Sequence, residues 1–357
     1  MTLLYWLRND LRLHDNAVLA ALPPGTTALL PVYCFDPAAL GPDAYLGLSR
    51  VGPHRLPFLL ETLADLQARY AARGAAVHFA IGRPAEVLTA LARQVGARAV
   101  WVSAEPTTEE MAAEAAVSVA LGPSVPLRRF DNQTLLPPAD LPIAVRELPF
   151  SFSKFRFDVA AKVAVRSPLP APRRLPLLPA GFAPAALPTA ALAAALGQPV
   201  LAAVARHRHS ARPALGGGET AALARLHDFA VERHLIGRYD DTRNQLLGEA
   251  FSTKLSAWLA NGSLSARQVW AAIDAYEATH GARSKDAQQL RLELLWRDYF
   301  RLLAWRAGPA FFGWRGLRGQ LPVPPSPTGP RSWPGRRAAP ATTSWMPICG
   351  SWPPPAL

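Results

Sequence analysis

The chain has 357 residues, half of them hydrophobic, a formal net charge of +12 and two cysteines, Cys34 and Cys349. This length suffices for two domains with a large buried core. No apolar stretch is long enough to cross a membrane, and no basic segment precedes an apolar run at the N-terminus, so neither a membrane span nor a signal peptide is expected. The distant cysteines exclude a disulfide framework, and no metal site is expected. A cytoplasmic protein fits best.

The positive charge has two interpretations. Clustered Lys and Arg side chains would indicate a polyanionic partner, nucleic acid above all, because they bind phosphates and displace counterions. Arginines scattered over the surface would indicate no such partner. Composition alone leaves both interpretations open.

Residues 1–130 alternate short apolar runs with helical patterns. Buried parallel strands are expected at 3–7, 28–35, 75–80 and 97–104, where the runs are largely apolar. Helices are expected at 54–74, which ends at Gly74, at 84–97, which begins with a proline, and at 107–122, with Thr107 as N-cap. This alternation predicts a doubly wound, Rossmann-like α/β domain over residues 1–130.

The loop after the first expected strand reads RNDLRLHDN, residues 8–16. It lacks the glycines that cradle a phosphate, so it is not a dinucleotide-binding fingerprint. Four charged side chains in nine residues can form a salt-bridged turn or serve catalysis. The structural role is the favoured interpretation.

Three further segments follow. Residues 131–215 are rich in Pro and Ala, which predicts an interdomain connector over the surface with little regular structure. Residues 216–320 show helical spacing, with a helix stop at Gly262 and an N-cap at Ser265, and predict an all-α domain. Residues 321–357 contain 11 prolines and no acidic residue, which predicts a disordered basic tail.

The helical segment contains three candidate elements for binding a ligand. RYDDTRNQLLG, residues 238–248, is a polar loop with one aromatic residue. STKLSAWL, residues 252–259, places hydroxyls and a lysine at a helix start, which suits a phosphate, and an ordinary N-cap explains the pattern as well.

The third element is the helix that contains ELLWRDYFRLLAW, residues 293–305. It carries Glu293, Trp296, Arg297 and Phe300 on one face and apolar residues on another. A simple ion pair of Glu293 and Arg297 explains part of the first face. A polar, aromatic ligand between helices would supply partners for all of it.

These blocks together resemble the cryptochrome/photolyase family, and within it the DASH-type cryptochromes. The similar blocks are, in chain order, LRNDLRLHDN, PVYCFDP, LPFSFSKFRFDV, GGETAALARL, YDDTRNQLLG, FSTKLSAWLANGSLSARQVW and LRLELLWRDYFRLL. The resemblance covers about residues 1–318. It implies an α/β antenna domain and an all-α FAD-binding domain, incomplete in this chain.

The resemblance implies the function of a blue-light photoreceptor or a deoxyribodipyrimidine photolyase. In such enzymes reduced FAD, excited by blue light, passes an electron to a cyclobutane pyrimidine dimer that is flipped out of DNA. The partner would be DNA that contains pyrimidine dimers, which DASH members tend to bind as single strands. The protein would be a monomer.

Roles for individual residues follow from the same resemblance. Glu293 would lie toward the flavin and the lesion, and Trp296 would stack on the flipped thymine pair, so these two are the candidate catalytic residues. The candidate FAD-binding residues are Tyr239, Ser252, Thr253, Lys254, Leu255, Ser256 and Arg297. A second antenna chromophore such as a folate is also implied, with Glu147 as its candidate contact.

Two departures from the family pattern are visible. Residues 284–292, SKDAQQLRL, stand where DASH members have a Ser/Thr-Tyr-Trp-like element, whose contacts therefore lack a counterpart here. Residues 344–356, SWMPICGSWPPPA, can be back-translated so that the frame two bases further on spells VDANMRELAATG, which resembles a later family block. We therefore expect a frameshift after about Gly319, which the nucleotide sequence tests.

A frameshifted chain would keep the phosphate side of the FAD pocket and lose the ring side. We expect it to bind FAD poorly and to repair little. Four apolar residues of the third element would then be exposed, namely Leu292, Leu295, Tyr299 and Leu302. A non-enzymatic blue-light signalling receptor and a remnant without function are the alternative interpretations.

Overall fold

The computed structural model describes residues 1–41, 50–52, 54–189, 192, 215–245, 248–280, 284–313 and 316–317. Residues Met1–Pro309 form one compact unit. The expected disordered tail, residues 321–357, lies outside the described residues. No helix in the described ranges combines the length and the apolar character that crossing a membrane requires.

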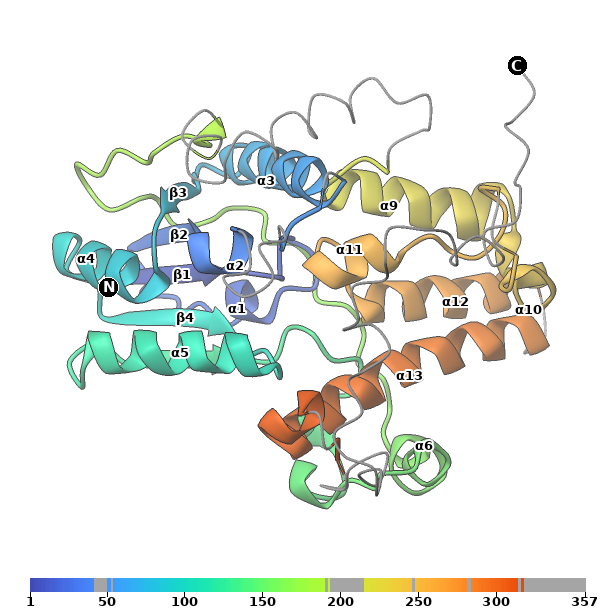
Figure 1. Ribbon diagram of the computed structural model, residues 1–357. Helices are drawn as coiled ribbons and strands as arrows, with labels where there is room; N and C mark the ends of the chain where they lie inside the picture. Colours follow the sequence, from blue (N-terminus) through green and yellow to red (C-terminus); the bar gives the residue numbers. More distant parts are fainter. Residues whose placement is uncertain are drawn as a thin grey trace, which may run out of the picture. The chain divides into compact units, whose positions relative to one another are not determined.

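A parallel sheet organises the N-terminal part of this unit (Figure 1). Its order is β3-β2-β1-β4-β5, with bounds β1 (Thr2–Leu7), β2 (Ala28–Phe35), β3 (His78–Ile81), β4 (Ala99–Ser103) and β5 (Leu127–Phe130). In the central register, Leu4 lies opposite Leu30 of β2 and Val100 of β4. The expected doubly wound, Rossmann-like fold is confirmed. Strand β5 was missed because its sequence, LRRF, has two exposed arginines and little apolar character.

Helices cover both faces of the sheet, because successive side chains of a strand point to opposite sides. On one face, α3 (Arg55–Ala71) packs Leu63 in a cluster with Leu3 of β1. On the other face, α4 (Pro84–Gln94) and α5 (Thr108–Leu121) pack in a cluster with Leu4 and Trp6 (Figure 1). The short helices α1 (Ala17–Ala20) and α2 (Pro37–Leu40) follow β1 and β2.

The sequence predicts that segment 131–215 runs over the surface. Its described part is instead partly buried. Leu135 and Phe155 are fully buried, and Leu135 belongs to the core of the helical part. Over residues 131–188 of this segment, all of which are described, the regular structure consists of short helical elements: η1 (Pro138–Asp140), η2 (Val145–Glu147), α6 (Phe152–Lys154), η3 (Phe155–Val159) and η4 (Ala160–Lys162). Isolated apolar residues without periodicity gave no sign of this burial.

The same segment covers an edge of the sheet. The Leu29 amide donates to the Leu177 carbonyl at 2.9 Å, and the Phe79 amide donates to the Ala185 carbonyl at 3.2 Å. These bonds satisfy backbone groups of β2 and β3 that would otherwise be open to pairing with another chain. The connector thus contributes to the stability of the α/β part.

In the second part of the unit, every regular element among the described residues is a helix or a helical turn. Its elements are α9 (Glu219–His227), η5 (Asp228–Glu232), η6 (Leu235–Arg238), α10 (Tyr239–Thr242), α11 (Ser256–Asn261), α12 (Ala266–His280) and α13 (Lys285–Ala307), followed by η7 (Gly308–Phe312). Gly262 ends α11 with a φ of 72°, as predicted. Ser265 and Gln268 bond each other's backbone amides at 3.0 and 2.8 Å, which confirms the predicted cap.

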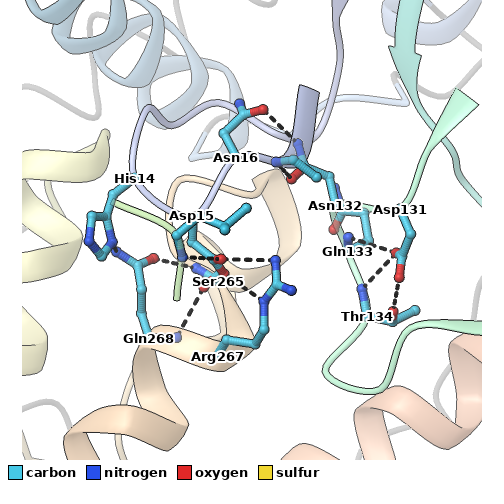
Figure 2. A network of polar contacts seen from close by, with 12 residues as sticks. His14, Asp15, Asn16, Asp131, Asn132, Gln133, Thr134, Ser265, Arg267 and Gln268 are labelled. Carbon is cyan, nitrogen blue, oxygen red and sulfur yellow. Dashed lines mark hydrogen bonds and ion pairs between the residues drawn. The ribbon is translucent and has the colours of Figure 1, made fainter. Parts of the chain in front are cut away.

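The loop 8–16 joins the α/β part to the helical part through buried charges (Figure 2). Asp15 forms a two-pronged ion pair with Arg267 of α12, at 2.8 and 3.0 Å. Arg12 donates to the carbonyl oxygens of Gly262 and Asn132, at 2.8 and 2.7 Å. These contacts agree with the structural role favoured for the loop.

Glu219 of α9 is a second buried junction. It is 0% exposed and accepts hydrogen bonds from the backbone amides of Leu13 and His14, at 2.8 and 3.0 Å. It also pairs with Arg69 of α3 at 2.9 Å. One carboxylate therefore ties together the loop after β1, α3 and α9.

Candidate functional site

A cavity of about 420 Å³ lies among α10, α11, α12 and α13. Figure 1 shows these four helices grouped in the helical part. Six of the residues singled out in the sequence line this cavity: Tyr239, Thr253, Leu255, Ser256, Glu293 and Arg297. They come from three separate sequence elements, which the fold brings together.

Two arginines of α13 give the cavity a positive charge. Arg297 donates to the carbonyl oxygens of Gln133 and Leu259, at 2.9 and 3.2 Å. Burial, and after it the Arg301 cation, lowers the pKa of Arg297 to about 9, so the side chain stays charged at neutral pH. In the described part of the chain, no carboxylate forms an ion pair with Arg297 or Arg301. Asp298 and Asp131 act on Arg297 from beyond ion-pair distance, so an anionic ligand in direct contact would add a closer counter-charge for this pair.

Glu293 and Tyr239 are two further polar residues of the lining. Glu293 accepts hydrogen bonds from Arg243 at 3.0 Å and from Gln289 at 2.8 Å, so its charge is already compensated. Tyr239 is 7% exposed. Burial, with a contribution from the Glu293 charge, raises the pKa of Tyr239 to about 12, so its phenol is neutral at physiological pH.

The turn 252–256 leads into α11 with an unusual backbone. Ser252 and Lys254 have φ values of 56° and 59°, in the left-handed region that residues with side chains rarely adopt. The Thr253 hydroxyl accepts a bond from the Leu255 amide at 3.3 Å, and the Thr253 carbonyl accepts one from Arg225 at 3.1 Å. Thr253, Leu255 and Ser256 line the cavity, whereas Ser252 and Lys254 are not among its lining residues. Backbone strain of this kind is concentrated at functional sites.

Trp296, the second candidate catalytic residue, does not line the cavity. Its ring stacks on Phe152 with a centroid distance of 3.5 Å and an interplanar angle of 12°. The sequence predicted one face of α13 with both polar and aromatic residues. In the structure these residues form two neighbouring stripes along the helix. Glu293, Arg297 and Arg301 follow one stripe at four-residue spacing, and Trp296 and Phe300 follow the other.

Glu147, the candidate contact for a second chromophore, lies apart from this cavity on the 3-10 turn η2. It is exposed, pairs with Arg146 at 3.3 Å and accepts a bond from the Ala144 amide at 3.3 Å. These contacts cap the turn and give no sign of a ligand.

Two of the four apolar residues of α13 that we expected to be exposed are buried. Tyr299 is 3% exposed and Leu302 is 0% exposed, so the expectation is wrong for both. The reason lies in the segment 150–160, whose Phe152 and Phe155 rings lie 5.5 and 5.2 Å from the Tyr299 ring. Leu292 and Leu295 are partly buried.

The cavity has further lining residues that the sequence did not single out: Leu259, Ala260, Val269, Leu290, Leu294 and Arg301. Arg301 could have been found, because it follows Arg297 by one helical turn and shares its face. The apolar residues could not, since their spacing is equally typical of a helical core.

A sequence model of the DNA photolyase family matches residues 3–173. The protein "Cryptochrome DASH" of Gloeobacter violaceus is 40% identical over 326 residues, which are 90% of this chain and 63% of that protein. "Blue-light photoreceptor PHR2" of Arabidopsis thaliana is 33% identical, over 84% of this chain and 68% of that protein.

The solved structure of a cryptochrome from Synechocystis sp. has a TM-score of 0.80 and 32% sequence identity to this chain. The match covers 91% of this chain and 65% of that structure, so the chain spans about two thirds of the length of these relatives. The similarity extends through both the α/β and the helical parts. The chain therefore belongs to the cryptochrome/photolyase family, in its DASH-type branch.

Proposed function

We propose that this protein is a FAD-dependent, blue-light-driven DNA photolyase of the DASH type, and that the cavity among α10 to α13 holds part of the FAD. The observation that carries the proposal is the pair Arg297 and Arg301, which lines a cavity without a carboxylate partner in the described ranges. A guanidinium pair of this kind suits a diphosphate, which offers several acceptor oxygens to its planar donors.

The other lining residues suit the remaining parts of a flavin nucleotide. The hydroxyls of Thr253 and Ser256 are positioned for phosphate or ribose oxygens, and Leu259 and Leu290 offer an apolar wall. Tyr239 adds an aromatic face with a neutral phenol.

When bound and reduced, FAD would supply the light-driven electron that splits a cyclobutane pyrimidine dimer. The residues of the chain would bind and orient the cofactor. Arg297 and Arg301 would neutralise its phosphates, and the carboxylate of Glu293, already bonded to Arg243, would keep a fixed negative charge in the lining.

DNA that contains pyrimidine dimers is the proposed substrate, with single-stranded DNA preferred and the protein acting as a monomer. The net charge of +12 favours binding of a polyanion. The half-exposed Phe300 offers aromatic surface on which unpaired bases can stack, and the neighbouring Trp296 would add to it when Phe152 does not cover its ring. A flipped dimer and an unpaired strand both present such bases.

A second cavity, of about 480 Å³, is the proposed place for an antenna chromophore. It lies at the carboxyl ends of β1 and β2 and is lined by Trp6, Tyr33, Arg8 and Arg55 among others. Ligands of open parallel sheets bind in the crevice outside the carboxyl ends of the strands. Aromatic walls suit a conjugated molecule such as a folate, and the lining offers both arginines and carboxylates to its polar groups. The arginines are Arg8, Arg50 and Arg55, and the carboxylates are Asp36, Glu109 and Glu110. This position is favoured over Glu147.

The test is repair of a synthetic oligonucleotide that carries one thymine dimer, with added FAD and reductant, in blue light and in darkness. The proposal expects slow, light-dependent loss of the dimer, and substitution Trp296→Ala should abolish it. Light-dependent reduction of bound flavin with no repair in either single- or double-stranded DNA would instead favour a signalling receptor.

A further inference from the structure

Phe152 lies face to face with Trp296 at the C-terminal half of α13. The ring centroids are 3.5 Å apart and the planes differ by only 12°. Aromatic side chains generally prefer offset or edge-to-face arrangements to such a close parallel sandwich. Nucleobases, by contrast, commonly lie flat on aromatic side chains in sites for single-stranded nucleic acid. The Phe152 ring thus occupies the place that a stacked base would take.

The backbone around Phe152 is anchored on either side of it. Before it, Arg306 donates a hydrogen bond to the Leu148 carbonyl and lies 3.5 Å over the ring of Phe150. After it, Phe155 is fully buried against Tyr299. Between these anchors, Ser151 and Ser153 are exposed; Ser151 precedes the three-residue turn α6 and Ser153 lies on it (Figure 1 labels α6). Phe152 can therefore turn outward while the core contacts on both sides remain.

We propose that Phe152 is an intramolecular occupant of the Trp296 stacking surface, and that an unpaired or flipped DNA base displaces it. This inference rests on the proposed function, because it takes a base of DNA as the incoming ring. The contact reduces the observed affinity for DNA, since only the fraction of molecules with Phe152 displaced can accept a base.

Exposed basic residues of the same segment fit this role. Lys154 and Arg156 follow Phe152 and are exposed, so both are available to phosphates of a bound strand. Phe152 would then leave Trp296 while Lys154 and Arg156, which are already exposed, contact the DNA backbone. Binding of a base must compensate for the lost contact between Phe152 and Trp296. A base that must first be unstacked from a duplex adds a further energetic cost, so the Phe152 contact favours bases that are already unstacked.

The first experiment measures binding of fluorescently labelled oligo(dT) to the full chain by anisotropy. Phe152→Ala should bind about fivefold more tightly, and Trp296→Ala about fivefold more weakly, the lower bound for loss of one stacked base. Phe152→Leu, which keeps apolar volume without a flat ring, should also bind more tightly. Phe157→Ala is the matched control, because its 65% exposed ring contacts Arg156 and not α13. Unchanged or weaker binding by Phe152→Ala would overturn the inference.

A second readout needs no DNA. Iodide quenching of tryptophan fluorescence should increase in Phe152→Ala relative to wild type, and this increase should vanish when Trp296→Phe is added. Absence of the increase contradicts the occupancy of Trp296 by Phe152, whatever the DNA result. Increased quenching together with no oligo(dT) binding by any variant would contradict the proposed function and, with it, displacement by a base.

Discussion

Asp298 is the buried acid that joins α13 to the segment 131–136. Its carboxylate is 0% exposed and accepts hydrogen bonds from the backbone amides of Leu135 and Leu136, at 2.6 and 2.9 Å. Burial raises the pKa of Asp298 to about 7, against the opposing effect of the two amides and of Arg297. Because each carboxylate oxygen of Asp298 accepts one of these amide N–H groups, a side chain with its own N–H donor would not fit at this position.

We therefore expect Asp298→Asn to lower the free energy of unfolding by about 2–4 kcal/mol, because the new amide turns a donor toward a backbone amide. Urea unfolding at neutral pH measures this. Asp274→Asn is the control: its side chain is 56% exposed and pairs with Arg291, so a loss below about 1 kcal/mol is expected. Equal effects of the two substitutions would contradict the role of Asp298.

The pH dependence of stability follows from the raised pKa of Asp298. Its folded pKa of about 7 exceeds the ordinary value of 3.8, so the folded state binds more protons between these values. The stabilising contribution is fully present below about pH 4 and is lost as the pH rises through about 7. The stability difference between wild type and Asp298→Asn should therefore shrink from pH 5 to pH 8. If this stability difference instead grew from pH 5 to pH 8, the two backbone amides would lower the pKa of Asp298 by more than burial raises it.

At the scale of single elements, the end of α11 packs closely against the loop after β1. Gly262 has a φ of 72°, and a Cβ atom added there would lie 1.8 Å from the Asn9 carbonyl oxygen. Its own carbonyl accepts the Arg12 bond at 2.8 Å. Both the backbone conformation and the space require glycine at this position.

Substitution Gly262→Ala should lower the free energy of unfolding by more than about 2 kcal/mol, since strain and steric overlap add. Thermal unfolding followed by circular dichroism gives the measurement. At Gly25 an added Cβ meets nothing within 4 Å, so Gly25→Ala should change stability by less than about 1 kcal/mol. A small effect at Gly262 would show that the loop moves away freely.

An element could be predicted where its own residues show a sequence pattern, and could not where distant residues determine its structure. Strand β2 has a long apolar run and was predicted with the bounds that the structure has, and the periodicity of residues 293–305 predicted a helix there, which is part of α13. Strand β5 is held by pairing with β4, and Leu135 is buried by distant residues, so neither left a local signal. In the site, the resemblance identified Tyr239 and Arg297, but no pattern could place Trp296 against Phe152, more than a hundred positions away.

At the scale of the whole molecule, residues Met1–Pro309 form one compact unit although they contain an α/β and a helical part. The Asp15–Arg267 pair and the Glu219 junction link the two parts through buried charges. Removing one partner of a buried pair leaves an uncompensated charge, which is strongly unfavourable. The two parts should therefore unfold together.

We expect a single cooperative transition by both far-UV circular dichroism and tryptophan fluorescence. Asp15→Asn should shift both curves by the same amount, corresponding to about 3 kcal/mol. Two separate transitions, or a shift in one probe only, would contradict the coupling.

The frameshift expected after Gly319 stays a prediction, which the nucleotide sequence of the gene tests.

The central claim is that the cavity beside Arg297 and Arg301 holds FAD, and titration of the purified protein with FAD tests it most directly. We predict less than one flavin per chain after purification, and saturable binding of added FAD. Arg301→Gln should weaken that binding about tenfold, the loss of one charge-assisted hydrogen bond, whereas Arg93→Gln on the exposed side of α4 should not. No saturable binding, or binding that Arg301→Gln leaves unchanged, would contradict the claim, and a full complement of flavin after purification would contradict the expected weakness.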